Sequence, residues 1–142
     1  MYFDEEMVVD LRFNTLNQFV DYFVIVESKF THKGDVRELK FNHKKFQKFK
    51  DKIIYLIYDN PPSQIETIND YDSEYEKACK YIFNAAYREN GQRNYIEKGL
   101  INAKKNDMIL VSDVDEIPNL SKIDFNTIEE KLILFRQDMF YY

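Results

Sequence analysis

The chain has 142 residues, of which 44% are hydrophobic, and it carries a formal net charge of -5 at pH 7. That length and hydrophobic share suffice for one globular domain with a buried core, which excludes a disordered chain. The acidic balance argues against sequence-independent binding to nucleic acid, because such binding depends on clustered Lys and Arg. The apolar runs at residues 23–26 and 108–111 are far shorter than the roughly 20 residues of a transmembrane helix. We therefore expect a single domain over residues 1–142, with neither a nucleic-acid partner nor a transmembrane segment.

The first part of the chain is predicted to contain a helix and two strands. Apolar residues recur at steps of three and four over residues 5–19, which indicates an amphipathic helix. The β-branched and aromatic run at 20–27 does not alternate cleanly, and this is typical of an interior parallel strand buried on both faces. After a polar connection, a short extended piece at 39–41 and a helical turn at 46–49, residues 53–58 are predicted to form a second buried strand.

A long loop at residues 59–72 separates this region from two further helical patterns, at 73–87 and 92–104, with a break or a kink expected at Asn90 and Gly91. The first of these patterns places six apolar residues on one broad face. They are Tyr75, Ala78, Cys79, Ile82, Phe83 and Ala86. Buried strands are expected at 108–111 and 132–135, and the alternation of strands and helices indicates an α/β fold with an open, mostly parallel sheet flanked by helices.

Three acidic residues follow the strand expected at 108–111, in the segment Ser-Asp-Val-Asp-Glu-Ile-Pro at 112–118. In open α/β sheets the ligand binds beyond the carboxyl ends of the strands, which is where these residues are placed. Alternation along an extended backbone puts the Asp113 and Asp115 carboxylates on one side, and carboxylate oxygens are the ligands that Mg²⁺ and Mn²⁺ prefer. Such an ion neutralises a leaving diphosphate. We therefore predict that Asp113 and Asp115 hold Mn²⁺ or Mg²⁺ and that Asp113 also belongs to the nucleotide site.

The acidic segment also has a plain structural interpretation, as a solvated turn before Pro118, and an isolated Asp-x-Asp leaves the two interpretations equally open. The crowding of three acids favours the functional one, because their mutual repulsion is unfavourable unless a cation is present. Arg93 is expected to pair with one of the aspartates or to reach the diphosphate, and Asn94 to orient a carboxylate. The alternative for these two residues is an exposed helix start.

The end of the first predicted strand supplies further polar residues at the same edge of the sheet. Glu27 and Ser28 are expected to hold the nucleoside with a carboxylate and a hydroxyl. His32 and His43 have no Cys or His at metal-ligand spacing, so neither is assigned a role. The Lys-rich stretch at 44–52 has Phe residues at helical spacing and is interpreted as a solvated face above a core contact rather than a phosphate-binding patch.

Several of these segments, taken in order, resemble glycosyltransferase family 17, the β-1,4-mannosyl-glycoprotein β-1,4-N-acetylglucosaminyltransferase family. The resemblance rests on Leu-Arg-Phe-Asn-Thr-Leu at 11–16, the strand and Ser at 20–28, Thr-His-Lys-Gly at 31–34, Gln-Arg-Asn at 92–94 with Gly-Leu at 99–100, and the acidic segment at 112–118. The form Asp-x-Asp-Glu-Ile-Pro is far more specific than Asp-x-Asp alone.

The resemblance implies a GT-A-like, Rossmann-like nucleotide-sugar-binding fold, Mn²⁺ or Mg²⁺, and inversion at the anomeric carbon. It also implies a UDP-sugar donor carrying N-acetylglucosamine and a glycan or glycoprotein acceptor, which animal members use in the Golgi. Family members usually have another strand before residues 2–5 and continue well past Tyr142. The chain therefore looks truncated, and the acceptor site and the catalytic base are expected in the remainder.

Two other functions compete with that of a glycosyltransferase. A haloacid-dehalogenase-type phosphatase also places Asp-x-Asp after a strand, but it needs a downstream Lys and further acids on later strands, and fewer than thirty residues follow Asp115. The alternative to the enzyme is a non-catalytic or truncated module that binds a sugar nucleotide or a metal ion, and turnover of a UDP-sugar to UDP would separate the two. No residue is nominated as the general base that an inverting transfer needs.

Overall fold

Two parallel strands, β1 (Phe23–Ser28) and β2 (Ile53–Tyr58), form the sheet of the computed structural model, which describes residues 1–138. Their register runs from Phe23 opposite Ile53 to Ser28 opposite Tyr58. On the other side of β1, Tyr2 forms an isolated parallel bridge with Glu27, and its backbone N–H donates to the Val26 carbonyl oxygen at 2.9 Å. The parallel pairing predicted for this strand is therefore confirmed. Its interior position is confirmed only in part, because the second neighbour is a single bridge at the carboxyl end of β1.

One face of the sheet is covered by α1 (Glu6–Leu16) and by η1 (His43–Phe49), a kinked 3-10 segment. Phe13 of α1 is fully buried, and its ring packs 4.5 Å from Phe23 and 5.2 Å from Phe46, measured between centroids. These rings belong to the main hydrophobic core of the chain. The buried members of that core are Tyr2, Val9, Phe13, Leu16, Phe23, Phe41, Phe46, Phe49 and Leu120.

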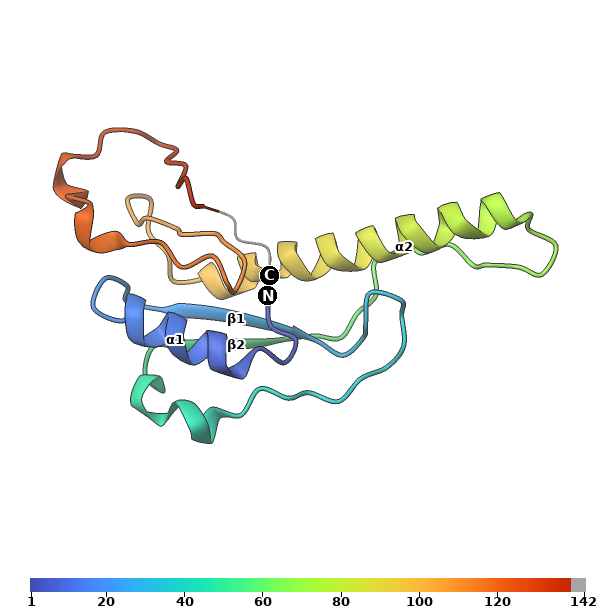
Figure 1. Cartoon of the computed structure of the whole chain (residues 1–142), viewed down its shortest axis with the longest axis horizontal. Coiled ribbons are helices and arrows are strands. Elements are labelled where there is room, and N and C mark those ends of the chain that lie inside the picture. The colour runs from blue at the N-terminus through green and yellow to red at the C-terminus, as the bar shows by residue number, and fades with distance from the viewer. Residues whose placement is uncertain (139–142) are drawn as a thin grey trace.

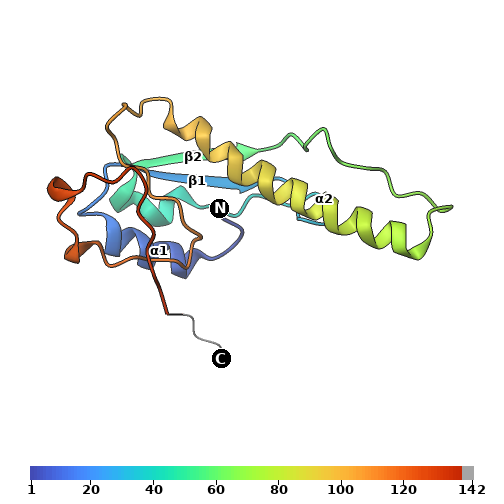
Figure 2. The ribbon, with the colours of Figure 1, turned by 90° about the horizontal axis from the view of Figure 1, so that it is seen from above.

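The other face of the sheet meets the end of α2 (Glu74–Asn94) and η2 (Tyr95–Leu100), as Figures 1 and 2 show. Two glycines allow the close approach. A Cβ on Gly99 would lie 2.5 Å from a Val24 methyl carbon, and one on Gly91 would overlap the Tyr58 hydroxyl oxygen. Gln92 also donates a hydrogen bond of 3.0 Å to the Val26 carbonyl oxygen, which ties α2 to β1.

The break expected at Asn90 and Gly91 is wrong, because α2 continues through both residues to Asn94. The helix predicted over 92–104 is correspondingly wrong: η2 ends at Leu100, and residues 103–112 have no regular structure. Gly91 carries helical backbone at the place where α2 presses on Tyr58, so the glycine serves packing rather than a turn.

The strands predicted at 108–111 and 132–135 are also absent from the part of the chain that the structure describes. Met108, Val111, Leu132 and Leu134 are all more than half exposed. The segment after 111 is fixed by a side chain of α1 instead of by pairing with the sheet, as described below. The α/β class is thus confirmed, with a parallel sheet of two strands instead of the larger open sheet expected. Between α2 and residue 138, the regular elements are η2 and two short 3-10 turns, η3 (Leu120–Lys122) and η4 (Phe125–Thr127).

The amino-terminal half of α2 projects from the body of the molecule (Figure 1). Its N-cap is Ser73, which forms a capping box with Glu76. The apolar face predicted to be buried is instead exposed on this projection, with Tyr75 at 79%, Ile82 at 67% and Phe83 at 54%.

Among residues 1–138, no helix is long and apolar enough to cross a membrane. The aromatic end of the chain at 139–142 lies outside the described residues.

Candidate functional site

The acidic segment forms a closed turn. The Glu116 backbone N–H donates to the Asp113 carbonyl oxygen at 3.2 Å, and the Asp113 backbone N–H donates to the Glu116 carboxylate at 2.9 Å. Glu116 therefore uses its side chain to close the turn. The side chain of Asp113 is 50% exposed, and Asp115, at the centre of the turn, is exposed.

Arg12 of α1 holds this turn in place. Its Nη1 donates at 2.9 Å to the carbonyl oxygens of both Asp113 and Glu116, and its Nη2 donates at 2.7 Å to the Ser112 hydroxyl. Burial lowers the pKa of the Arg12 guanidinium, and the nearby carboxylates of Glu116, Asp113 and Asp115 oppose that effect. One side chain thus binds both ends of the turn.

Sequence reasoning did not single out Arg12 as a site residue. The available signal was its place in the family-like segment at 11–16, next to the buried Phe13. Its partners lie about a hundred residues further along the chain, and most are backbone carbonyls, which leave no trace in the residue types. Only the tertiary structure shows that Arg12 contacts the acidic turn.

Arg93, in the last turn of α2, reaches the same acidic turn. Its Nη2 lies 3.3 Å from the Asp113 carboxylate and 3.3 Å from that of Glu89, one helical turn earlier. The ion pair with an aspartate that the sequence suggested is therefore present. Both partners are partly exposed, so the pair contributes little to stability and can exchange for another ligand.

Two guanidinium groups thus accompany the three acids of the turn. The α-amino group of Met1 lies near them as well; burial lowers its pKa, and Asp113 opposes that shift. Because Arg12 and Arg93 already offset the repulsion, the crowding of the acids does not require a metal ion. The crowding of the acids therefore does not favour a metal site over a solvated turn.

The donor chemistry of the turn nevertheless suits a divalent cation. No hydrogen bond or ion pair within residues 1–138 engages the Asp115 carboxylate, and Asp113 shares one oxygen with Arg93. Two carboxylates leave most of the coordination sphere of Mg²⁺ or Mn²⁺ for phosphate and water oxygens, as these ions prefer. No group of three or more His, Cys, Asp or Glu side chains in the described part of the chain forms a closed protein site.

A shallow cavity of about 440 Å³ adjoins Asp115. Its other lining residues are Ile117, Pro118 and Asn119, which follow the turn, and residues 135–138. The exposed carboxylate of Asp115 is thus beside a hollow whose size falls in the range of small-ligand sites.

Glu27, predicted to hold the nucleoside, is fully buried at the carboxyl end of β1. Its carboxylate accepts hydrogen bonds from the Tyr55 hydroxyl at 2.7 Å, from the backbone N–H groups of Lys40 and Phe41 at 2.7 and 3.0 Å, and from Arg37 at 3.1 Å. These four donors all come from the protein. The structure therefore gives Glu27 the role of fastening the connection between β1 and η1, while a contact with nucleotide stays a prediction.

The other two predicted nucleotide contacts are placed differently. Ser28 is buried at the end of β1, and its hydroxyl accepts from the Phe30 backbone N–H at 3.0 Å. Asn94 is exposed at the end of α2, next to Arg93, and no hydrogen bond among the described residues joins its side chain to the acidic turn. The predicted orientation of a carboxylate by Asn94 is thus not seen.

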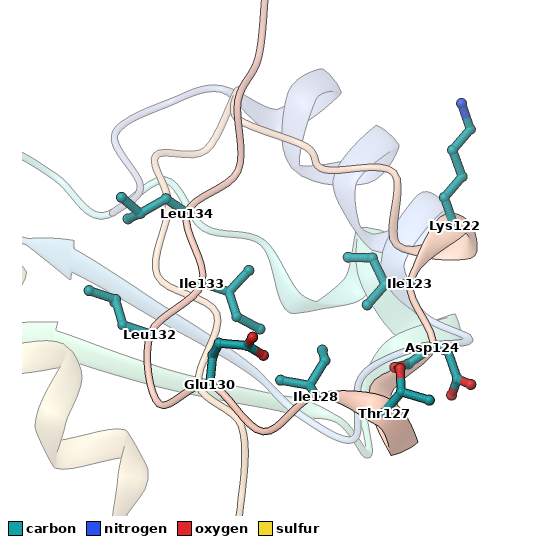
Figure 3. A pocket seen from close by; sticks show the side chains of 9 residues that line it. All are labelled: Lys122, Ile123, Asp124, Thr127, Ile128, Glu130, Leu132, Ile133 and Leu134. Carbon is teal, nitrogen blue, oxygen red and sulfur yellow. The ribbon is translucent and has the colours of Figure 1, made fainter.

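A second cavity, of about 480 Å³, lies under the carboxyl-terminal segment (Figure 3). Figure 3 shows Ile123, Ile128 and Ile133 directed toward the space between them, with Asp124, Thr127 and Glu130 at the border. No residue of the acidic turn lines this cavity. It has an apolar floor without convergent polar groups, and we assign it no function.

Comparison with known proteins places the chain in a family. The model of glycosyltransferase family 17 matches residues 1–132. The chain is 30% identical, over 116 residues, to proteins named beta-1,4-mannosyl-glycoprotein 4-beta-N-acetylglucosaminyltransferase from Homo sapiens, Rattus norvegicus and Mus musculus. The match covers 78% of this chain and 19% of each relative. No solved structure matches the chain.

The matched residues 1–132 include α1 with Arg12, the end of α2 with Arg93, and the acidic turn. The site described above therefore lies within the region that defines the family. The chain belongs to glycosyltransferase family 17.

Proposed function

We propose that this chain binds the donor of a glycosyltransferase reaction, a UDP-sugar carrying N-acetylglucosamine, on a GT-A-like fold. Asp113 and Asp115 would hold Mn²⁺ or Mg²⁺ against the donor diphosphate. The observation that carries the proposal is the exposed Asp115 on a turn fixed by Arg12 and Arg93. Family membership and the relatives' printed names support the sugar.

In the proposed transfer, a hydroxyl of a glycan acceptor attacks the anomeric carbon of the donor. The bond from that carbon to the diphosphate oxygen breaks, UDP leaves, and the configuration inverts. A divalent ion bound at this turn supplies positive charge to the leaving diphosphate. The acceptor proton passes to a general base, for which no residue of this chain is nominated.

The residues of the chain have separate tasks in this proposal. Arg12 keeps the Asp113–Glu116 turn rigid, which places the carboxylates before any ligand arrives. Arg93, whose ion pair with Asp113 is partly exposed, is free to turn from that aspartate to a phosphate oxygen once a cation takes its place. Ser28 and Glu27, at the end of β1, shape the neighbouring wall where the nucleoside is expected.

Calorimetric titration of UDP and UDP-N-acetylglucosamine, with and without Mn²⁺, tests the donor site. We expect binding that needs Mn²⁺, is reversed by EDTA, and weakens at least about tenfold in Asp115→Asn, since even residues that only orient metal ligands change affinity by that much. Asp21→Asn is the matched control, because Asp21 is an exposed aspartate that precedes the amino end of β1. Binding that is indifferent to Mn²⁺ and to Asp115→Asn would overturn the metal role.

The alternative function, that of a non-catalytic module, predicts the same donor binding in these titrations. The two differ in turnover: release of UDP from UDP-N-acetylglucosamine, dependent on Mn²⁺ and lost in Asp115→Asn, identifies the enzyme. Binding without release in the presence of glycan acceptors identifies a binding module. The short match to the relatives makes this distinction necessary, because the chain spans 19% of their length.

A further inference from the structure

The projecting part of α2 carries an uncovered apolar stripe. We define the α2 stripe as the residues Tyr75, Ala78, Cys79, Ile82, Phe83 and Ala86. The opposite side of the helix is occupied by the loop at 59–72. There Lys80 Nζ donates to the Asp72 carboxylate at 2.7 Å, and Asn84 exchanges hydrogen bonds of 2.8 and 2.9 Å with the backbone of Glu66. At about 100° of rotation per residue, Lys80 and Asn84 point away from the stripe.

The stripe is large enough to bind a partner. Tyr75, Ile82 and Phe83 are 79%, 67% and 54% exposed. Side chains of this size place about 400 Å² of accessible surface in one patch, and patches of that area on a monomer are often functional. An aromatic and aliphatic surface on a projecting helix fits another helix with the same character.

The order of residues in the stripe makes it complementary to itself. If two copies of α2 lie antiparallel and are centred between Cys79 and Ile82, Tyr75 faces Ala86 of the other copy and Ala78 faces its Phe83. Each large side chain then meets a small one, which lets the two helices approach closely. A parallel pair would place each large side chain against its own counterpart.

The acidic start of α2 favours the same direction. Glu74 and Glu76 lie in the first turn, and the side chain of Glu74 is 93% exposed. A parallel pair would place these acids against the same acids of the other copy, whereas an antiparallel pair separates them and opposes the helix dipoles favourably.

We propose that two copies of this chain associate through their α2 stripes as an antiparallel helix pair, with the bodies of the two molecules at opposite ends. Two stripes bury about 800 Å² together, which is below the roughly 1,200 Å² at which stable specific complexes begin and falls among weak, transient ones. The dimer is therefore weak and is expected at micromolar or higher concentrations. This proposal does not depend on the donor site.

Sedimentation velocity of the whole chain, from about 1 to 500 μM, tests the association in the range expected for an interface of this size. We expect a reversible monomer–dimer equilibrium that Ile82→Arg weakens by more than about tenfold, because the variant places a charge in the apolar contact. Tyr81→Arg is the matched control: Tyr81 is 58% exposed on the same helix but lies off the stripe. Circular dichroism checks that both variants keep their helix.

Cross-linking tests the direction of the helices. In a Cys79→Ser background, a cysteine introduced at position 74 is about 20 Å from its counterpart in the antiparallel pair and adjacent to it in a parallel one. We expect a short bismaleimide to join two wild-type chains through Cys79 and to leave Glu74→Cys in that background uncrosslinked. A chain that stays monomeric at every concentration, or an Ile82→Arg variant that associates like wild type, would overturn the proposal. Efficient cross-linking of Glu74→Cys would overturn the antiparallel arrangement.

Discussion

At the scale of single residues, Arg12 decides where the acidic turn lies. The turn belongs to a segment without regular structure, and three hydrogen bonds from one guanidinium join it to α1. Arg suits this position because its planar fork donates in several directions at once, whereas Lys has a single ammonium on a flexible stem. The geometry of Asp113 and Asp115 therefore depends on a residue that is not itself acidic.

Replacing Arg12 tests this dependence. We expect Arg12→Met to lower the free energy of unfolding by about 2 kcal/mol, which is the scale of hydrogen bonds made by a charged group. The free energy of unfolding of Arg12→Lys should lie between those of Arg12→Met and wild type. Lys45→Met is the control, since the exposed pair of Lys45 with Glu6 contributes less than about 1 kcal/mol. Urea denaturation measures both. Equal losses in the two Met variants would contradict the assigned role of Arg12.

Glu27 shows which features of a site residue cannot be predicted from its residue type. Its position at the end of a buried strand was correctly inferred, whereas its complete burial and its four hydrogen-bond donors within the protein were not. Three of those donors lie in the connection at 37–41 and one lies on β2. The sequence indicates that a carboxylate stands at the edge of the sheet, but the groups that satisfy it depend on how that connection folds back.

At the scale of elements, the contact between α2 and β2 rests on the absence of a side chain at Gly91. A Cβ there would overlap the Tyr58 hydroxyl oxygen and lie 3.0 Å from Cζ of the same ring. Tyr58 is buried, so its ring has little room to move aside. The glycine thus fixes how closely the end of α2, with Arg93, approaches the sheet.

Substitution at Gly91 measures this contact. Alanine favours a helix over glycine by about 1 kcal/mol, but we expect Gly91→Ala to destabilise the fold by about 1–3 kcal/mol because overpacking outweighs the propensity. The loss should shrink in a Tyr58→Phe background, where the hydroxyl is gone, and a double-mutant cycle by urea denaturation gives the coupling. Asn90→Ala, on an exposed position of the same helix, should be neutral or slightly stabilising. A stabilising Gly91→Ala would contradict the close approach.

The elements also differ in how far local sequence determines them. α1, β1, β2 and the start of α2 follow from apolar spacing, β-branched runs and a capping residue, all of which act over a few residues. The runs at 108–111 and 132–135 have the composition of strands and yet remain unpaired. A strand exists only with a partner for its backbone, and the partner is chosen by tertiary contacts.

At the scale of the whole molecule, the core is built largely from Phe and Tyr, and one buried tyrosine links stability to pH. Tyr2 is 2% exposed. Burial, followed by the charge of Glu27, raises the pKa of the Tyr2 hydroxyl to about 12 from the usual value of 10.0. Below pH 10 the folded and unfolded chains both keep this proton. Between pH 10 and 12 only the folded chain keeps it, so stability falls as the pH rises through that window.

We expect Tyr2 to account for about 2–3 kcal/mol of lost stability between pH 10 and 12, given a shift of about two pH units. Tyr2→Phe has no proton to lose, so its free energy of unfolding should fall less steeply over that window. Tyr22→Phe, at a tyrosine that is 62% exposed, serves as the control. Urea unfolding of the three proteins at pH 9, 10, 11 and 12 makes the comparison. If the free energies of unfolding of wild type and Tyr2→Phe fell equally steeply between pH 10 and 12, the link between Tyr2 and pH-dependent stability would be contradicted.

The sequence by itself determined the family, the α/β class, the two parallel strands and the acidic segment that follows α2. These depend on residue type and short-range spacing, which are present in the chain before it folds. Only the tertiary structure decided that Arg12 holds the acidic turn, that Glu27 is satisfied within the protein, and that the α2 stripe faces outward. Those outcomes depend on groups far apart in sequence, often backbone carbonyls, and residue types do not record which of them meet.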